Sequence, residues 1–249
     1  MAKWRKTTVA GPLVMEAVYP AINPRDSETV RREKKKLTTM ARQLANDKAA
    51  YRKLELWLAA NFTPGDLFLT LTYDDEHLPG SRKEALLRIR YFWRKLSVAR
   101  AAKGQELRYI YVTEHKHGEG RWHHHVFINA TGEDFEDIRK AWIYGKVQDY
   151  EKFELSRDKT YETMARYLTK ENRDKPGDNF FNHSQNLRKP ETETRRIPND
   201  EDLKPPKEAV VLFDTGDVRT AYGHYRFIKY MYTPTAKAPR AKRRKRRKI

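Results

Sequence analysis

The stretch Trp122-His123-His124-His125-Val126-Phe127-Ile128 decides the fold. Its apolar second half is typical of a buried β-strand, and five of the eight histidines of the chain fall between positions 115 and 125. Because successive side chains of a strand point to opposite faces, His123 and His125 share one face, whereas His124 lies on the other face with the apolar residues. Two imidazoles therefore point the same way, close enough to bind one metal ion.

A partner strand precedes this stretch. Residues 107–114 form a second predicted strand, and the connecting loop 115–121 contains two glycines, which indicates a hairpin. Antiparallel pairing places Glu114, at the end of the first strand, opposite the two histidines. Two neutral imidazoles and a carboxylate suit Mn²⁺ or Mg²⁺ and leave positions open for water and phosphate oxygens. A His-x-His pair on a strand can equally be ordinary polar surface.

Hydrophobic periodicity predicts the other elements around this hairpin. A short strand over 12–19 and a long basic helix from about 27 to 60, with a break near 46–47, come first. Later strands are expected over 67–73, 146–154, 209–213 and 222–232, and later helices over 81–103, 133–143 and 160–171. Residues 176–206 are expected to be irregular. The pattern predicts an α+β fold with a central, mainly antiparallel β-sheet flanked by helices.

Composition limits the partners and the metal ligands. The chain of 249 residues has 52 basic and 34 acidic residues, a net charge of +18 that favours a polyanionic partner, either nucleic acid or an anionic membrane. It has no cysteine, so a bound metal needs nitrogen and oxygen ligands. Without a long apolar run or a secretory signal, we expect a soluble intracellular protein with no membrane partner.

The helix expected over 160–171 carries a candidate nucleophile. Tyr161 and Leu168 share its apolar stripe, whereas Tyr167 lies off that stripe and Lys170 follows on the same face one turn later. A free phenol titrates near pH 10, so it needs a cation, a base or a metal-polarised phosphate to act as a nucleophile. Lys170 is a suitable cation, although such a pair can also be an ordinary surface pair.

Three segments together resemble the HUH endonuclease superfamily, in particular the rolling-circle (Rep-like) replication initiators of small phages and plasmids. The segments are Phe68-Leu69-Thr70-Leu71-Thr72-Tyr73, then Glu114 with Gly120-Arg121-Trp122-His123-His124-His125-Val126, then Ala165-Arg166-Tyr167-Leu168-Thr169-Lys170. The resemblance covers about residues 67–172. It implies that the histidine pair lies on a middle strand of a central antiparallel sheet, and that Glu114, His123 and His125 bind Mn²⁺ or Mg²⁺. It also implies that Tyr167 is the nucleophile and that Lys170 assists it.

The resemblance further implies an enzyme that nicks and rejoins single-stranded or hairpin origin DNA through a 5′-phosphotyrosine intermediate. No phosphate-binding loop of the Gly-x-x-x-x-Gly-Lys-Ser/Thr type occurs, so a separate host helicase and polymerase are expected, in the cytoplasm of a bacterial host cell. The expected DNA-binding residues are Arg121, Arg166, Asn182, His183, Ser184 and Asn186. The aromatic residues Tyr109, Tyr111 and Trp122 can either stack on bases or belong to the core.

Four segments are expected along the chain. Residues 1–60 are an N-terminal strand and basic helix, 61–175 the HUH-type nuclease core, and 176–236 an irregular segment with a C-terminal β-hairpin that completes the domain. Residues 237–249 contain nine basic and no acidic residues and are expected to form a disordered basic tail.

Two departures from the superfamily pattern are visible. His124 replaces the usual apolar residue between the ligands, and Thr163 stands where two-tyrosine members carry a second tyrosine, which predicts a single-tyrosine enzyme. The alternatives are a single-tyrosine relaxase or transposase, and a non-catalytic basic nucleic-acid-binding protein.

Overall fold

The computed structural model describes residues 3–20, 39–115, 121–156, 160–168, 181–198, 200–220 and 223–232. Lys170 and the basic tail 237–249 lie outside the described residues. Two compact units make up the chain: Met1–Ala49 with Lys189–Ile249, and Ala50–Arg188. None of the described helices is long and apolar enough to cross a membrane.

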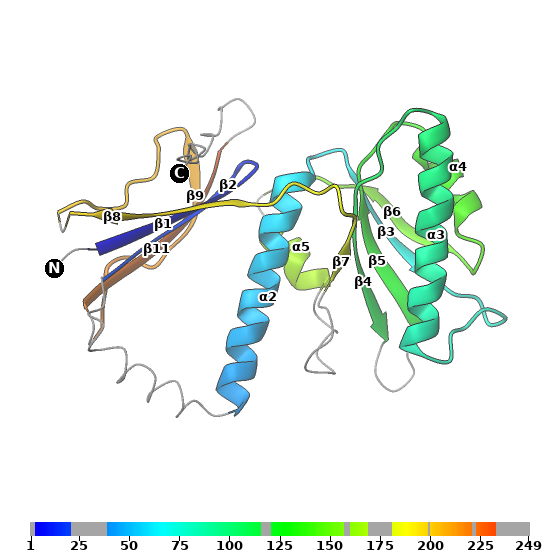
Figure 1. Cartoon of the computed structure of the whole chain (residues 1–249), viewed down its shortest axis with the longest axis horizontal. Coiled ribbons are helices and arrows are strands. Elements are labelled where there is room, and N and C mark those ends of the chain that lie inside the picture. The colour runs from blue at the N-terminus through cyan, green and yellow to red at the C-terminus, as the bar shows by residue number, and fades with distance from the viewer. Residues whose placement is uncertain are drawn as a thin grey trace, which may run out of the picture. The chain divides into compact units, whose positions relative to one another are not determined.

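The unit Ala50–Arg188 is built on a five-stranded antiparallel sheet (Figure 1). Its strand order is β6-β3-β5-β4-β7, so that β5 is the middle strand. The strands are β3 (Leu67–Thr72), β4 (Tyr109–His115), β5 (Trp122–Ile128), β6 (Val147–Lys152) and β7 (Asn182–His183). The helices are α3 (Arg82–Ala102), α4 (Asp134–Ala141), α5 (Tyr161–Leu168) and the second half of α2 (Thr39–Asn61).

One face of this sheet is covered by α3 and α4, which Figure 1 shows on the side opposite α5. The hydroxyl of Ser81 caps α3 by accepting a hydrogen bond from the Glu84 backbone N–H. The helices and strands share one apolar core, which contains Leu67, Leu69, Leu71, Ile89, Phe92, Leu96, Val126, Ile128 and Ile138. Inside it, the buried ion pair Arg100–Asp134, at 2.7 Å, ties α3 to α4.

The other face carries a layer of aromatic side chains. Phe127 of β5 contacts Phe62 next to the end of α2, Phe68 of β3 and Phe153 next to the end of β6, with ring centroids 5.2–5.6 Å apart. Tyr161 packs on Phe153 and donates a hydrogen bond to the Phe62 carbonyl. This layer holds α5 over the face of the sheet that carries His123 and His125.

The other unit contains a six-stranded antiparallel sheet. Its strands are β1 (Lys3–Ala10), β2 (Leu13–Pro20), β8 (Glu191–Ile197), β9 (Ala209–Asp214), β10 (Val218–Thr220) and β11 (Gly223–Tyr232). The main order is β10-β11-β2-β1-β8, and β9 also pairs with β11. Strands from both halves of the chain therefore contribute to one sheet, whose core includes Val14, Ile197 and Ile228.

The α+β class is confirmed, and the described elements differ from the expectations in four places. The strand expected over 12–19 is present as β2, and it pairs with β1, which was not expected. The described part of the long helix runs unbroken through 46–47. Within 176–206, β8 is a seven-residue strand. The C-terminal hairpin exists, but β11 hydrogen-bonds to β2, so it does not complete the sheet of the expected nuclease core.

Candidate metal centre and active site

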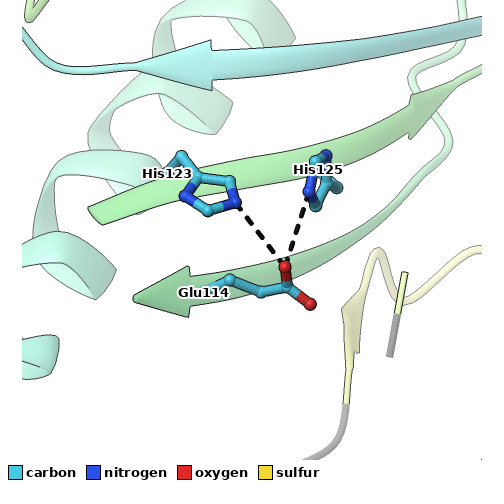
Figure 2. A group of neighbouring side chains, drawn as sticks. All are labelled: Glu114, His123 and His125. Carbon is cyan, nitrogen blue, oxygen red and sulfur yellow. Dashed lines mark ion pairs between the residues drawn. The ribbon is translucent and has the colours of Figure 1, made fainter. Parts of the chain in front are cut away.

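The β4–β5 hairpin brings three potential metal ligands together. Its register places Glu114 opposite His123 and Val112 opposite His125, so all three ligand side chains lie on one face. Glu114 Oε2 lies 3.5 Å from Nε2 of His123 and 3.5 Å from Nε2 of His125 (Figure 2). With metal–ligand bonds of about 2.0–2.2 Å, atoms that share an ion lie about 3–4 Å apart, so these spacings fit one ion.

The second nitrogen of each ligand histidine has a partner that orients the ring. Nδ1 of His123 lies 3.1 Å from the Arg121 carbonyl oxygen, which can only accept, so Nδ1 carries the proton. Nδ1 of His125 lies 3.1 Å from Thr70 Oγ1 on the neighbouring strand β3. A neutral ring with its proton on Nδ1 presents the lone pair of Nε2, and such partners commonly fix the tautomer of metal-binding histidines.

Glu114 is the observation that favours a metal most strongly. Its side chain is 2% exposed, and Oε1 is among the few buried side-chain atoms of the described residues without a hydrogen-bond partner. Burial alone would raise the pKa of Glu114, but hydrogen bonds and charge from His123 and His125 outweigh burial and lower it. A buried carboxylate with an unsatisfied oxygen beside two imidazole nitrogens is a donor set that a divalent cation completes.

Tyr167 belongs to the same site. Its ring packs edge-on against His125 and Phe68, with centroids 5.1 Å and 5.8 Å away, yet the residue remains 47% exposed. It lines a cavity of about 630 Å³ together with His123 and His125. The rest of the lining consists of Thr70, Thr72, Tyr73, Asp74, Asp75, Arg121, Trp122, Lys146 and Gln148. The cavity therefore presents a phenol, two imidazoles, two cations and two carboxylates to one ligand.

His124 lies on the opposite face, as the alternation predicts. It is fully buried, with Nδ1 2.9 Å from Thr113 Oγ1 and Nε2 2.7 Å from the Tyr73 hydroxyl. Burial lowers the pKa of His124 to about 3, helped by the nearby charges of His123 and His125, so the ring is neutral at pH 7. Both ring nitrogens of the buried His124 therefore have a hydroxyl group as hydrogen-bond partner.

The remaining expected site residues lie in different places. Arg121 lines the cavity, donates to the Tyr73 carbonyl oxygen at 2.9 Å and forms an ion pair with Asp75. Arg166 is not part of that lining; it pairs with Glu162 and lies 4.8 Å over the ring of Tyr51.

The polar run after β7 has structural partners. The Ser184 hydroxyl accepts a hydrogen bond from the Tyr109 backbone N–H, and Asn186 donates to Glu106 and to the Leu107 carbonyl oxygen. Asn182 and His183 form the short strand at the sheet edge. Whether these residues contact DNA stays a prediction.

The structure shows which of the three aromatic residues that could stack on bases reaches the cavity. Tyr111 belongs to the core between the sheet and α3, and Tyr109 stacks on Trp93 at 3.7 Å in the same layer. Trp122 packs against the same core and, in addition, lines the cavity. Of the three expected stacking residues, only Trp122 is placed to meet a ligand there.

Sequence reasoning missed Lys146 and Gln148. They reach the cavity because β6 pairs with β3, and the chain approaches β3 closely at Gly145. Gly145 has φ +159°, and a Cβ there would come within 2.2 Å of the Thr72 carbonyl oxygen. The glycine before a predicted strand was the available signal, since it marks a close backbone approach.

Comparison with protein families gives a match over part of the chain. Residues 66–172 match the family model of ORF2-type replication-associated proteins, which covers less than half of the chain. This segment contains β3, the metal-ligand hairpin and Tyr167, and the match supports a role in DNA replication and an interaction with nucleic acid. Searches of curated proteins and of solved structures gave no significant match.

Proposed function

We propose that this chain is a rolling-circle replication initiator that nicks and rejoins single-stranded origin DNA, with Tyr167 as the covalent nucleophile. One observation carries the proposal: Tyr167, His123 and His125 line a single cavity, beside a buried carboxylate that has an unsatisfied oxygen. The replication-associated match over the same residues supports the biological role. A separate host helicase and polymerase are part of the proposal.

Glu114, His123 and His125 would hold Mn²⁺ or Mg²⁺, which when bound would act as a Lewis acid toward the scissile phosphate. The Tyr167 oxygen forms a bond to phosphorus as the bond from phosphorus to the 3′ oxygen breaks. The leaving oxygen ends as a free 3′-hydroxyl, with the phenol proton transferred to it or to water. Attack by a 3′-hydroxyl on the phosphotyrosine reverses these changes and rejoins the strand.

Other side chains of the cavity suit this reaction. Arg121 and Lys146 add positive charge at the cavity wall, where it stabilises the phosphate oxygens. The contacts with His125 and Phe68 hold the Tyr167 ring in place, while its exposed fraction leaves the side chain accessible to a strand of DNA. Positioning of this kind is a major part of phosphoryl-transfer catalysis.

The test is a covalent adduct that survives SDS. The full chain, origin-like single-stranded oligonucleotide and Mn²⁺ are expected to give the adduct, and Tyr167→Phe is expected to abolish it. Tyr161→Phe is the matched control, because Tyr161 is buried and its hydroxyl donates to the Phe62 carbonyl oxygen. That variant should keep the adduct and lose about 1 kcal/mol of stability.

Undiminished adduct in Tyr167→Phe would reject the assignment of the nucleophile. DNA binding without adduct in the unmodified chain, with either metal, would instead identify a non-catalytic binding protein. A single-tyrosine relaxase or transposase would give the same adduct, so these alternatives are distinguished by sequencing the joined products, which shows whether the enzyme rejoins the ends of a replication origin or of another site.

A further inference from the structure

A cluster of aromatic and basic side chains lies outside the cavity already described. The ring of His183 stacks on Trp57 with centroids 4.4 Å apart and an angle of 27°, and Phe181 lies 6.0 Å from His183 and 6.5 Å from Trp57. Lys53 Nζ lies 5.8 Å over the Phe181 ring. These four residues are called the aromatic cluster below. His183 and Lys53 are exposed, and the other two are half-buried.

The aromatic cluster shares a face of the sheet with the metal ligands. His183 lies opposite Ile110 of β4, and Ile110 lies four residues before Glu114, so all three are on the same face. At about 3.3 Å per residue along a strand and about 4.8 Å between strands, the backbone of His183 lies on the order of 14 Å from that of Glu114. A single strand bound at the metal centre can therefore reach the aromatic cluster within a few nucleotides.

The aromatic cluster is held in place before any ligand binds. The Asn61 side chain accepts a hydrogen bond from the Arg188 backbone N–H and donates to the carbonyl oxygens of Arg188 and Trp57. Asn61 is buried, so this clamp joins α2 firmly to the segment that follows β7. The pairing of β7 with β4 holds His183, just before that segment, against the sheet. Binding there costs little ordering of the chain.

We propose that the aromatic cluster is a second subsite for single-stranded DNA, which stacks a base a few nucleotides from the phosphate at the metal centre. Unstacked bases bind aromatic faces regardless of sequence, and a neighbouring lysine neutralises the phosphate backbone. A stack that served only to close the core would not leave the His183 ring exposed. The inference rests on the proposed function only in taking DNA as the ligand of the metal centre.

The test measures binding and not cleavage. In the full chain carrying Tyr167→Phe, with Mn²⁺ present, fluorescence anisotropy gives the affinity for oligo(dT) chains from about 4 to about 16 nucleotides, a range of known single-strand site sizes. Trp57→Ala should weaken binding of the longer chains by about 5- to 100-fold, the loss expected for one stacked base, and leave the shortest unchanged. Trp57→Phe should retain most of the affinity.

Matched controls lie on the other side of the same sheet. Phe135 of α4 is 46% exposed and packs on Tyr150, so Phe135→Ala should not affect binding. Lys53→Ala should reduce the slope of the logarithm of the binding constant against the logarithm of the salt concentration by about one. Lys95 of α3, which lies 4.9 Å over the Tyr91 ring, provides the corresponding lysine control.

Two results would overturn the subsite: equal loss for short and long chains, or no loss in Trp57→Ala. If Trp57→Ala fails to fold, His183→Ala removes an exposed side chain and should still weaken binding of the longer chains selectively. The two proposals fail separately. A length-dependent effect of Trp57→Ala without any adduct in the unmodified chain keeps the subsite and rejects the nicking function.

Discussion

The ring of Tyr167 lies 5.1 Å from the ring of His125, centroid to centroid, at an angle of 61°. This contact connects α5 to the middle strand of the sheet, and it does so on the face that carries Glu114. A phosphate bound to an ion held by His125 would therefore lie beside the Tyr167 side chain. The following predictions depend on this arrangement and on the groups that support it.

Removing both imidazoles should separate catalysis from DNA binding. His123→Ala combined with His125→Ala is expected to abolish adduct formation, because Glu114 alone cannot hold the cation. Salt-sensitive DNA binding should remain, since it comes from lysine and arginine side chains. His77→Ala combined with His224→Ala removes two histidines from outside the metal centre and should keep both activities. Metal-dependent cleavage in the first variant would reject the metal centre.

Thr70 is expected to tune the metal affinity through His125. Thr70→Val removes the partner of Nδ1 and should weaken Mn²⁺ binding by about 10- to 100-fold, measured by calorimetric titration. Thr72→Val is the control, because the Thr72 hydroxyl donates to the Lys146 carbonyl oxygen. Equal affinities of the two variants would show that Thr70 does not orient the ligand.

His124 predicts a specific dependence of stability on pH. Its pKa falls from 6.5 to about 3 on folding, so below pH 6.5 the unfolded chain binds a proton that the folded chain does not. The resulting stabilisation of the folded state is largest above pH 6.5. The free energy of unfolding therefore decreases as the pH falls from 6.5 toward 3, by at most about 1.4 kcal/mol per pH unit from His124. Urea unfolding of His124→Leu between pH 7 and pH 4 should show a shallower decrease than the unmodified chain. Parallel decreases would contradict a neutral buried His124.

The basic tail should add affinity without adding selectivity. Deleting residues 237–249 removes nine positive charges and should weaken binding to all DNA sequences by a similar factor, most strongly at low salt. Competition between origin and unrelated oligonucleotides measures the selectivity. A selective loss of origin binding would mean that the tail reads sequence.

The grouping of Glu114, His123 and His125 could be predicted from sequence because all the information for it is local. Period-two alternation separates His124 from His123 and His125, and a short connection fixes Glu114 opposite them. The strands β1 and β8 could not be predicted in this way. Arg5 of β1, for example, is a charged residue that does not indicate a buried strand in the sequence. It is accommodated there because the fold brings Glu16 and Glu201 next to it as ion-pair partners.

Edge strands and long-range pairings explain the other misses. All residues of β8 except Ile197 are exposed, so this edge strand has no apolar alternation to recognise. Lys146 and Gln148 enter the cavity because β6 pairs with β3, and Gly145 signals a close backbone approach without indicating which strand is approached.

The sheet that joins β1 and β2 to β8 and β11 affects the order in which the protein can assemble during synthesis. The strands of Ala50–Arg188 are all available once the ribosome has passed β7, so this unit can close first. The hairpin β1–β2 is synthesised before these strands. Its β2 edge is paired only when β11 has been translated, and β11 is the last strand of that sheet to be made. A chain truncated after residue 188 and released is thus expected to carry the complete five-stranded sheet and a hairpin with both outer edges open.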